Sequence, residues 1–308
     1  MDDKYYKYIV LYVLLFFINF LKAYGLPQLG LGYTNILDGG PVRPYPGIYW
    51  QHWLQYYTTQ RFLDNKGKPL GGLPSPRFRG VEYVTELTYQ CETQFPLGGM
   101  PGVEIVVPFI LMGKIEKNEL GLASSGAGVG DLGFAAYIQW PAIFYNDRPL
   151  FIHRLQFGFT IPVGKNKLPE KNINPSNSFF YCGPNWSATL YLSERWSMSW
   201  SWYYVWCAQN EKINFRAGDA IHGNYSLAYE VAPRLYLGAV GYALQQLHNN
   251  RSNGLTVPHS KERVFGIGPG AAYFFSKDLI FFSYLYFEAG ARNHTQGTNF
   301  ISRLVLHF

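Results

Sequence analysis

Apolar and polar residues alternate one by one in segment after segment of this chain. In residues 81–94 most apolar side chains, from Val81 to Tyr89, fall at odd positions, whereas Glu82, Glu86 and Gln90 fall at even positions. Because successive side chains of an extended strand point to opposite faces, this period of two predicts a β-strand with one apolar and one polar face. The final residues, 299–308, repeat the pattern and end on an aromatic side chain. The repetition predicts an all-β fold.

About twelve such segments follow residue 46. Their expected bounds are 47–62, 81–94, 103–115, 131–140, 150–162, 185–193, 196–213, 220–231, 234–246, 263–275, 279–289 and 299–308. Short connections alternate with mostly longer ones, such as 63–80 and 163–184. Outer-membrane barrels have short periplasmic turns and longer external loops, and a soluble sandwich has no reason for this alternation. We therefore predict a transmembrane antiparallel β-barrel of about twelve strands over residues 47–308, in the bacterial outer membrane.

Composition and charge agree with a wall that meets lipid. Aromatic residues make up 18% of the chain and charged residues only 15%, whereas soluble domains carry about a quarter charged residues. The net charge of +6 is expected to gather in two outer loops, beside anionic lipopolysaccharide and membrane lipid. The residues concerned are Lys66, Lys68, Arg77, Arg79, Lys165, Lys167 and Lys171. No domain presents these charges to a nucleic acid, so no nucleic-acid partner is expected.

The first 46 residues differ from the rest. Lys4 and Lys7 precede an apolar run over 8–21, and Ala23-Tyr24-Gly25 gives a small-x-small cleavage pattern. This predicts a signal peptide over residues 1–25, because the apolar run is short for a membrane anchor of roughly twenty residues. Residues 26–46, rich in Gly and Pro, form either a periplasmic lead-in, which we favour, or a plug in the lumen. The closing Phe308 resembles the signal that the barrel-assembly machinery recognises.

Several motifs follow one another in a characteristic order. Residues 46–50 read Pro-Gly-Ile-Tyr-Trp, and the Tyr-rich strand after them ends in Arg61-x-x-Asp64. Residues 128–131 read Gly-Val-Gly-Asp, and residues 268–270 read Gly-Pro-Gly. Together these motifs resemble the outer-membrane family named after the meta-cleavage pathway of phenol degradation. The resemblance implies a transport role beside aromatic catabolism, akin to channels for hydrophobic compounds, and it supplies no catalytic residues.

Polar residues on the strands are expected to face the lumen, because an Arg facing lipid at the midplane costs about 2–4 kcal/mol. Glu92, Glu230, Glu288 and Tyr57 belong to this inward set. The candidate lumen-lining residues are Tyr49, Gln51, Trp53, Glu82, Glu86, Gln90, Arg154, Gln156, Tyr284, Tyr286 and Arg303. They form either a salt-bridge network that fills a narrow barrel or a selectivity lining with aromatic surfaces, and the two interpretations can coexist. The expected lumen is closed or nearly closed to ions.

Three classes of function remain, and the favoured one is a channel or transporter for small, hydrophobic or aromatic molecules rather than an enzyme. The alternative is a barrel-embedded lipid-modifying hydrolase. His222, Asn224 and Ser226 share one strand face, but steps of roughly 6–7 Å exceed a nucleophile–base hydrogen bond of about 3 Å. No catalytic residue is therefore assigned. A further alternative is an adhesion or structural protein.

Neither a metal nor a cofactor is expected. The histidines show no His-x-x-x-His spacing, and Cys91, Cys182 and Cys207 form no Cys-x-x-Cys pair. The cysteines form either a Cys182–Cys207 disulfide or buried free thiols, and we favour the free thiols.

Overall fold

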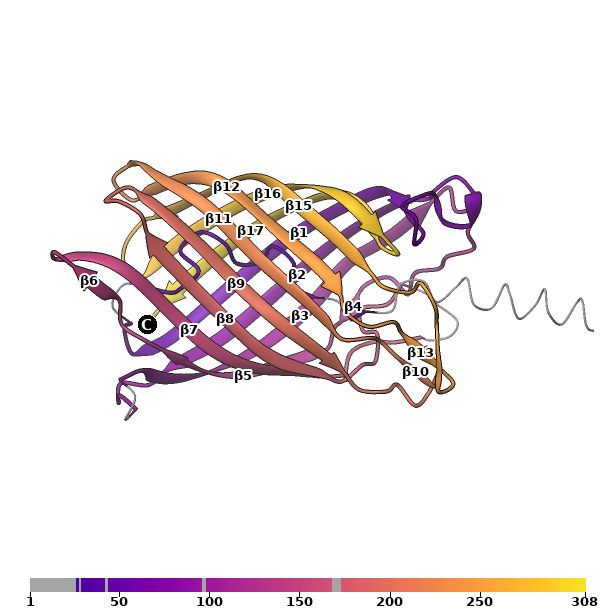
Figure 1. Cartoon of the computed structure of the whole chain (residues 1–308), viewed down its shortest axis with the longest axis horizontal. Helices are drawn as coiled ribbons and strands as arrows, with labels where there is room; N and C mark the ends of the chain where they lie inside the picture. The colour runs from indigo at the N-terminus through magenta and orange to yellow at the C-terminus, as the bar shows by residue number, and fades with distance from the viewer. Residues whose placement is uncertain (1–25, 28, 42–43, 96–97, 168–172) are drawn as a thin grey trace, which may run out of the picture.

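Twelve long strands close into a single antiparallel barrel (Figure 1). The computed structural model describes residues 26–27, 29–41, 44–95, 98–167 and 173–308. The wall strands are β1 (Gly47–Phe62), β2 (Arg77–Gln90), β3 (Met100–Glu116), β5 (Leu132–Gln139), β7 (Arg148–Ile161), β8 (Tyr181–Tyr191), β9 (Trp196–Cys207), β11 (Ala220–Ala232), β12 (Leu235–Gln246), β15 (Arg263–Phe274), β16 (Leu279–Arg292) and β17 (Thr295–His307). Each pairs with its neighbours in chain order, and β1 pairs with β17 to close the barrel.

The remaining described elements are short. They are the 3-10 turn η1 (Leu70–Gly72) and the strands β4 (Gly128–Val129), β6 (Ile143–Tyr145), β10 (Phe215–Arg216), β13 (Arg251–Ser252) and β14 (Leu255–Thr256). The last three form a separate small sheet in the loops at one end of the barrel, and β6 pairs with β7 at the other (Figure 1). Among the described residues there is no helix of the length and apolarity needed to cross a membrane.

The two ends of the barrel differ in their connections. Tight turns such as Ser193–Arg195 join one set of strand pairs, and long segments such as 247–262 join the other. We call these the short-turn end and the long-loop end. In an outer-membrane barrel the short-turn end faces the periplasm. The predicted fold class and the outer-membrane location are confirmed.

Some expected positions are wrong. Arg77 and Arg79 lie in β2, paired with Glu116 and Lys114, rather than in a loop. Strand β9 ends at Cys207 instead of residue 213, because the chain turns back and the Asn210 N–H donates to the Phe215 carbonyl at 2.8 Å.

Other expectations fall beyond the wall strands. Glu92 lies past the end of β2 in an exposed turn and does not face the lumen. Lys171 and the predicted signal peptide, residues 1–25, lie outside the described residues.

The outer face of the wall is apolar. Along β9 the serines at 197, 199 and 201 are buried, whereas Trp196, Met198 and Trp202, which alternate with them, are exposed. The same holds for Leu54 on β1, Phe157 on β7 and Phe300 on β17. Because the barrel is closed, no unpaired strand edge faces the hydrocarbon. The apolar outer surface is therefore compatible with contact to lipid.

We expect Leu54→Arg to destabilise the folded barrel by about 2–4 kcal/mol, because residue 54 lies midway along β1 with a side chain that is 47% exposed on the lipid face. Urea titration in lipid vesicles measures the loss. Leu255→Arg is the matched control, since Leu255 is 75% exposed in a long loop and should lose little. Equal losses in both variants would contradict the assigned lipid face.

The three cysteines are free, as favoured, but only Cys207 is buried, whereas Cys91 and Cys182 are half-buried. Cys182 pairs in register with Trp206, and Cys207 pairs with Tyr181. Because neighbouring positions of a strand point to opposite faces, the two thiols lie on opposite sides of the wall and no bridge can join them.

Candidate functional site

The described residues of 26–46 contact the inner face of the barrel from one end to the other. The Leu26 N–H donates to the Glu262 carboxylate at 2.9 Å, near the long-loop end. The Gly39 N–H donates to the Thr189 hydroxyl at 2.9 Å, near the short-turn end, where β1 then begins at Gly47. Of the two alternatives for this stretch, the contacts favour the lumen. We call residues 26–46 the inner segment.

Glycine lets the inner segment lie directly against the wall. A Cβ at Gly39 would come within 2.6 Å of the Ile152 carbonyl oxygen and the Thr189 nitrogen. Gly32 has a φ of +80°, and a Cβ there would lie 2.8 Å from the Tyr286 ring. The glycine content of this segment is therefore a requirement of close approach and backbone conformation.

Polar side chains of β11 hold the inner segment in place. The Gly32 N–H donates to Asn224 Oδ1 at 2.8 Å, and the Ser226 hydroxyl donates to the Asn35 carbonyl at 3.0 Å. The buried His222 ring stacks on Tyr203 at 4.4 Å. The three residues weighed as a catalytic cluster thus engage the inner segment or a neighbouring aromatic ring, and none of these contacts joins a hydroxyl to the imidazole.

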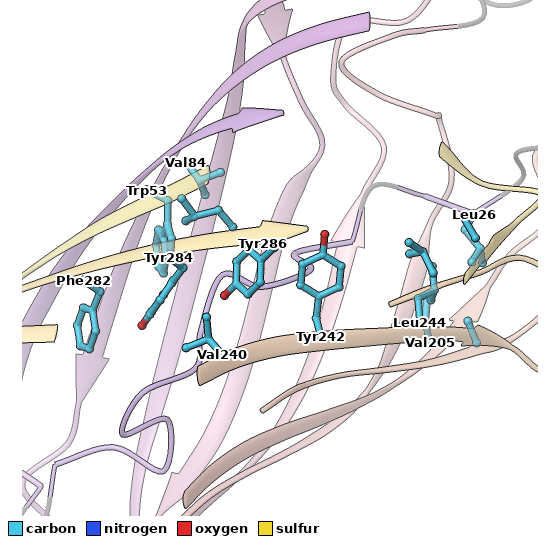
Figure 2. Close-up of a cluster of buried hydrophobic side chains, with 14 of the residues drawn as sticks. Leu26, Trp53, Val84, Val205, Val240, Tyr242, Leu244, Phe282, Tyr284 and Tyr286 are labelled. Carbon is cyan, nitrogen blue, oxygen red and sulfur yellow. The ribbon is translucent and has the colours of Figure 1, made fainter. Parts of the chain in front are cut away.

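Buried aromatic side chains form a row beside the inner segment (Figure 2). Figure 2 shows Leu26 at one end of this row, Tyr242 and Tyr286 within it and Phe282 at the other end. Tyr286 is fully buried, and its hydroxyl donates to the Gly32 carbonyl at 2.8 Å. These rings pack against the inner segment and fix its course.

Three cavities follow one another along the barrel interior. The outer cavity, about 350 Å³, lies toward the long-loop end and is lined by Leu26, Tyr57 and Glu288 among others. The middle cavity, about 280 Å³, and the vestibule at the short-turn end, about 900 Å³, follow it. Glu82 lines both the outer and the middle cavity. The residues common to the middle cavity and the vestibule are Gln51, Arg154 and Arg303.

The junction between the middle cavity and the vestibule, which we call the neck, is crossed by one chain of polar side chains from β17, β1 and β2. Arg303 Nε donates to Gln51 Oε1 at 3.0 Å, and a second guanidinium nitrogen donates to the same oxygen. Gln51 Nε2 in turn donates to Glu86 Oε1 at 2.6 Å. The Arg303 guanidinium also lies 5.0 Å from the Trp53 ring centre. Each of these side chains thereby restricts the conformation of the side chain that it contacts.

A second polar chain joins β7 to β3 across the neck. Arg154 Nη1 lies 3.1 Å from Glu104 Oε1, and Gln156 Nε2 donates to Glu104 Oε2 at 2.6 Å. The side chains of Gly133 and Ala135 on the intervening β5 are small, which leaves room for these long side chains to meet. The neck carries two guanidinium and two carboxylate groups, so its charges balance.

The structure distributes the sequence candidates over these features. Tyr49 and Gln90 line the vestibule, while Trp53, Glu82, Glu86 and Gln156 line the middle cavity. Tyr284 and Tyr286 are buried against the inner segment and are not among the residues lining the three cavities. Glu230 lines the vestibule and Glu288 the outer cavity.

Sequence reasoning missed Glu104, whose carboxylate binds Arg154. Its signal was present, because Glu104 is the one charged residue in the otherwise apolar run of residues 100–113. A lone carboxylate in such a strand must find a donor on the inner face.

Similarity to solved structures shows the fold. An outer-membrane channel from Pseudomonas putida F1 is 16% identical, with a TM-score of 0.73 over 86% of this chain and 96% of that chain. A FadL homologue from Pseudomonas aeruginosa is 9% identical, with a TM-score of 0.41 over 92% of this chain and 99% of that chain. No curated protein is similar enough in sequence to count as a match.

Similarity in sequence shows the family. The sequence profile of the family described as "Putative MetA-pathway of phenol degradation" matches residues 73–304. This range covers β2 to β17 almost completely, including both polar chains of the neck except Gln51. The chain belongs to this phenol-degradation family of outer-membrane barrels.

Proposed function

We propose that the barrel passes small, hydrophobic or aromatic molecules across the outer membrane without performing chemistry on them. The observation that carries the proposal is the line of three cavities, which share lining residues from the long-loop end to the short-turn end. The family description points to aromatic catabolism, and the P. putida relative of the same fold is described as a channel. Both agree with a passive route.

The lining supports apolar rather than ionic cargo. The middle cavity is bordered by the side chains of Tyr33, Trp53, Val84 and Val106. Flat and branched apolar surfaces of this kind suit an aromatic solute, and the polar side chains that share the cavity can fix its orientation. At the neck Arg154 is paired with Glu104, and Gln51 bridges Arg303 and Glu86, so a passing ion gains little there while losing its hydration. The barrel should therefore be nearly closed to ions.

The inner segment narrows this route and acts as a plug in the proposal. It supplies Tyr33 to the middle cavity and Asp38 to the vestibule. In this proposal a solute passes between the inner segment and the part of the wall formed by β2, β3, β5, β7 and β8. The contacts of Asn224 and Ser226 with the segment leave the hydrolase alternative without a positioned nucleophile.

Contacts with the membrane are part of the proposal. The exposed Lys66, Lys68 and Lys167 in the outer loops support contact with anionic lipopolysaccharide. The alternating faces of β17 support recognition of this strand by the barrel-assembly machinery before the barrel closes.

Flux measurements test the route directly. Vesicles with an outer leaflet of lipopolysaccharide, which slows apolar solutes, should take up labelled phenol and benzyl alcohol faster with the purified barrel than without it, with little uptake of sucrose. Ala135→Trp should reduce this flux about tenfold or more, because residue 135 faces the middle cavity and indole fills it. Ala136→Trp is the matched control, since its side chain is exposed on the outer face.

Two outcomes would contradict the proposal. Equal flux through folded Ala135→Trp and Ala136→Trp barrels would remove the middle cavity from the path. No flux at all in the unaltered protein would favour adhesion or a structural role.

A further inference from the structure

Leu26 and Glu262 make a buried contact across 236 residues of chain. The Leu26 nitrogen lies 2.9 Å from Glu262 Oε1, and the two residues are only 8% and 3% exposed. The Leu26 carbonyl accepts a hydrogen bond from Asn177 Nδ2 at 3.2 Å, and its side chain belongs to the buried apolar cluster (Figure 2). Both backbone groups and the side chain of this residue are therefore fixed at the long-loop end.

A buried polar network holds the backbone of Glu262. The Glu262 N–H donates to Gln246 Oε1, and the Gln246 N–H donates to the Glu262 carbonyl, both at 2.8 Å. Gln246 Nε2 donates to Asn250 Oδ1 at 2.6 Å, and the Asn250 N–H donates to the Ser260 hydroxyl at 2.8 Å. Gln246 and Asn250 are fully buried. The backbone that carries the Glu262 side chain is thus fixed, and the residue is buried, unlike a mobile surface carboxylate.

Leu26 directly follows Ala23-Tyr24-Gly25, the small-x-small pattern in the sequence. We propose that the Gly25–Leu26 peptide bond is hydrolysed, and that the new α-ammonium of Leu26 forms a buried ion pair with Glu262 that anchors the inner segment. Water supplies a hydroxyl to the Gly25 carbonyl carbon and a proton to the Leu26 nitrogen as the C–N bond breaks. The two products ionise as a carboxylate and an ammonium. A signal-peptide-cleaving peptidase performs this step.

Electrostatics support the pairing. Removing a carboxylate from water costs several kcal/mol, and a cation in hydrogen-bond contact offsets that cost. A hydrogen bond from an ammonium to a carboxylate is roughly twice as strong as one between neutral groups. Hydrolysis before Leu26 would place the positive charge within hydrogen-bond distance of Glu262 without any movement of the backbone.

The position of Leu26 in the barrel supports cleavage at this bond. Leader peptides are removed on the side of the membrane that the short-turn end faces. Leu26 lies at the opposite end, so a leader still joined to it would have to leave the barrel through the long loops. Its apolar run, residues 8–21, would then meet water. Cleavage before assembly removes that cost.

The ion pair changes how the inner segment is held. One end is fixed by charge to Glu262 and the other by the peptide chain to β1 at Gly47. With both ends fixed, the inner segment stays inside the lumen and divides it along its length. This inference concerns processing and anchoring, and it stands whether or not the barrel passes aromatic solutes.

Mass spectrometry of the protein purified from outer membranes is the first test. The intact mass should equal that of a chain beginning at Leu26. In the folded barrel, the α-amine should react with an acylating reagent roughly tenfold or more slowly than in the urea-unfolded chain, because burial shields it. Peptide mapping identifies the labelled amine. A different first residue, or equal rates in the two states, would overturn the proposal.

Variants separate the ion pair from burial alone. Glu262→Gln keeps the shape of the side chain but removes its charge, so the Leu26 α-amine should become reactive in the folded barrel. Glu119→Gln, in an exposed loop, should keep the protection of the unaltered protein. Heat-modified mobility on gels verifies folding, and an Ala inserted before Leu26 provides a second variant that displaces the ammonium. Full protection in folded Glu262→Gln or in the insertion variant would refute the ion pair.

Discussion

Deleting residues 29–40 is expected to raise the single-channel conductance of the barrel by roughly an order of magnitude. The deleted stretch supplies Tyr33 to the middle cavity and Asp38 to the vestibule, so its loss merges these spaces into one wider lumen. The inner-face groups of Asn224, Ser226 and Thr189 would then be hydrated by lumen water. Planar-bilayer recordings in KCl measure the change.

A deletion outside the lumen provides the comparison. Residues 119–122 lie in a long loop, and their removal should leave conductance close to that of the unaltered protein. Both variants must migrate as folded barrels before heating. Unchanged conductance in a folded barrel lacking residues 29–40 would show that the inner segment does not limit the path.

Arg154→Ala is expected to lower the free energy of unfolding by roughly 2–4 kcal/mol. The substitution leaves the Glu104 carboxylate, whose side chain is only 4% exposed, without the guanidinium that lies 3.1 Å away. Tryptophan fluorescence during urea titration in lipid vesicles measures the difference, since the chain has 8 tryptophans. Adding Glu104→Gln should recover much of the loss, because a neutral amide needs no counter-charge.

The exposed pair of Arg79 and Glu116 is the matched control. Its atoms lie 3.8 Å apart, and its side chains are 36% and 33% exposed. Arg79→Ala should therefore change stability by only about 0–1 kcal/mol. If Arg79→Ala and Arg154→Ala had equal effects, the neck pair would be solvated like a surface pair.

The positions of the strands were predictable where apolar and polar residues alternate one by one. Residues 81–94 and 150–162 alternate cleanly, and each expected span overlaps an observed strand that ends within a few residues of it. The errors lie at positions whose structure depends on residues distant in the sequence. The alternation of Trp residues after residue 196 predicted a strand to residue 213, but it does not indicate the turn in which the Asn210 backbone bonds to Phe215. Arg77 and Arg79 look like loop residues until Glu116 and Lys114 are known to lie opposite them.

The site was harder to predict than the wall. Gln51, Arg154 and Arg303 could be assigned to the inner face from their positions along the strands, but their meeting at one neck depends on registers between strands distant in sequence. The inner segment has no period at all, so its course is determined by Gly32 and Gly39 fitting against specific rings and backbones. The sequence shows these glycines, but it does not show which groups they contact.

The inner segment also dictates an order of events during biogenesis. It precedes β1, and β1 must pair with β17 to seal the wall. After β1 and β17 have paired, a chain starting at Leu26 would need to thread about twenty residues lengthwise through the filled lumen. Folded proteins avoid threading of this kind. The segment must therefore be captured while the sheet is still an open trough. Seam closure between β1 and β17 then becomes the irreversible step that traps it.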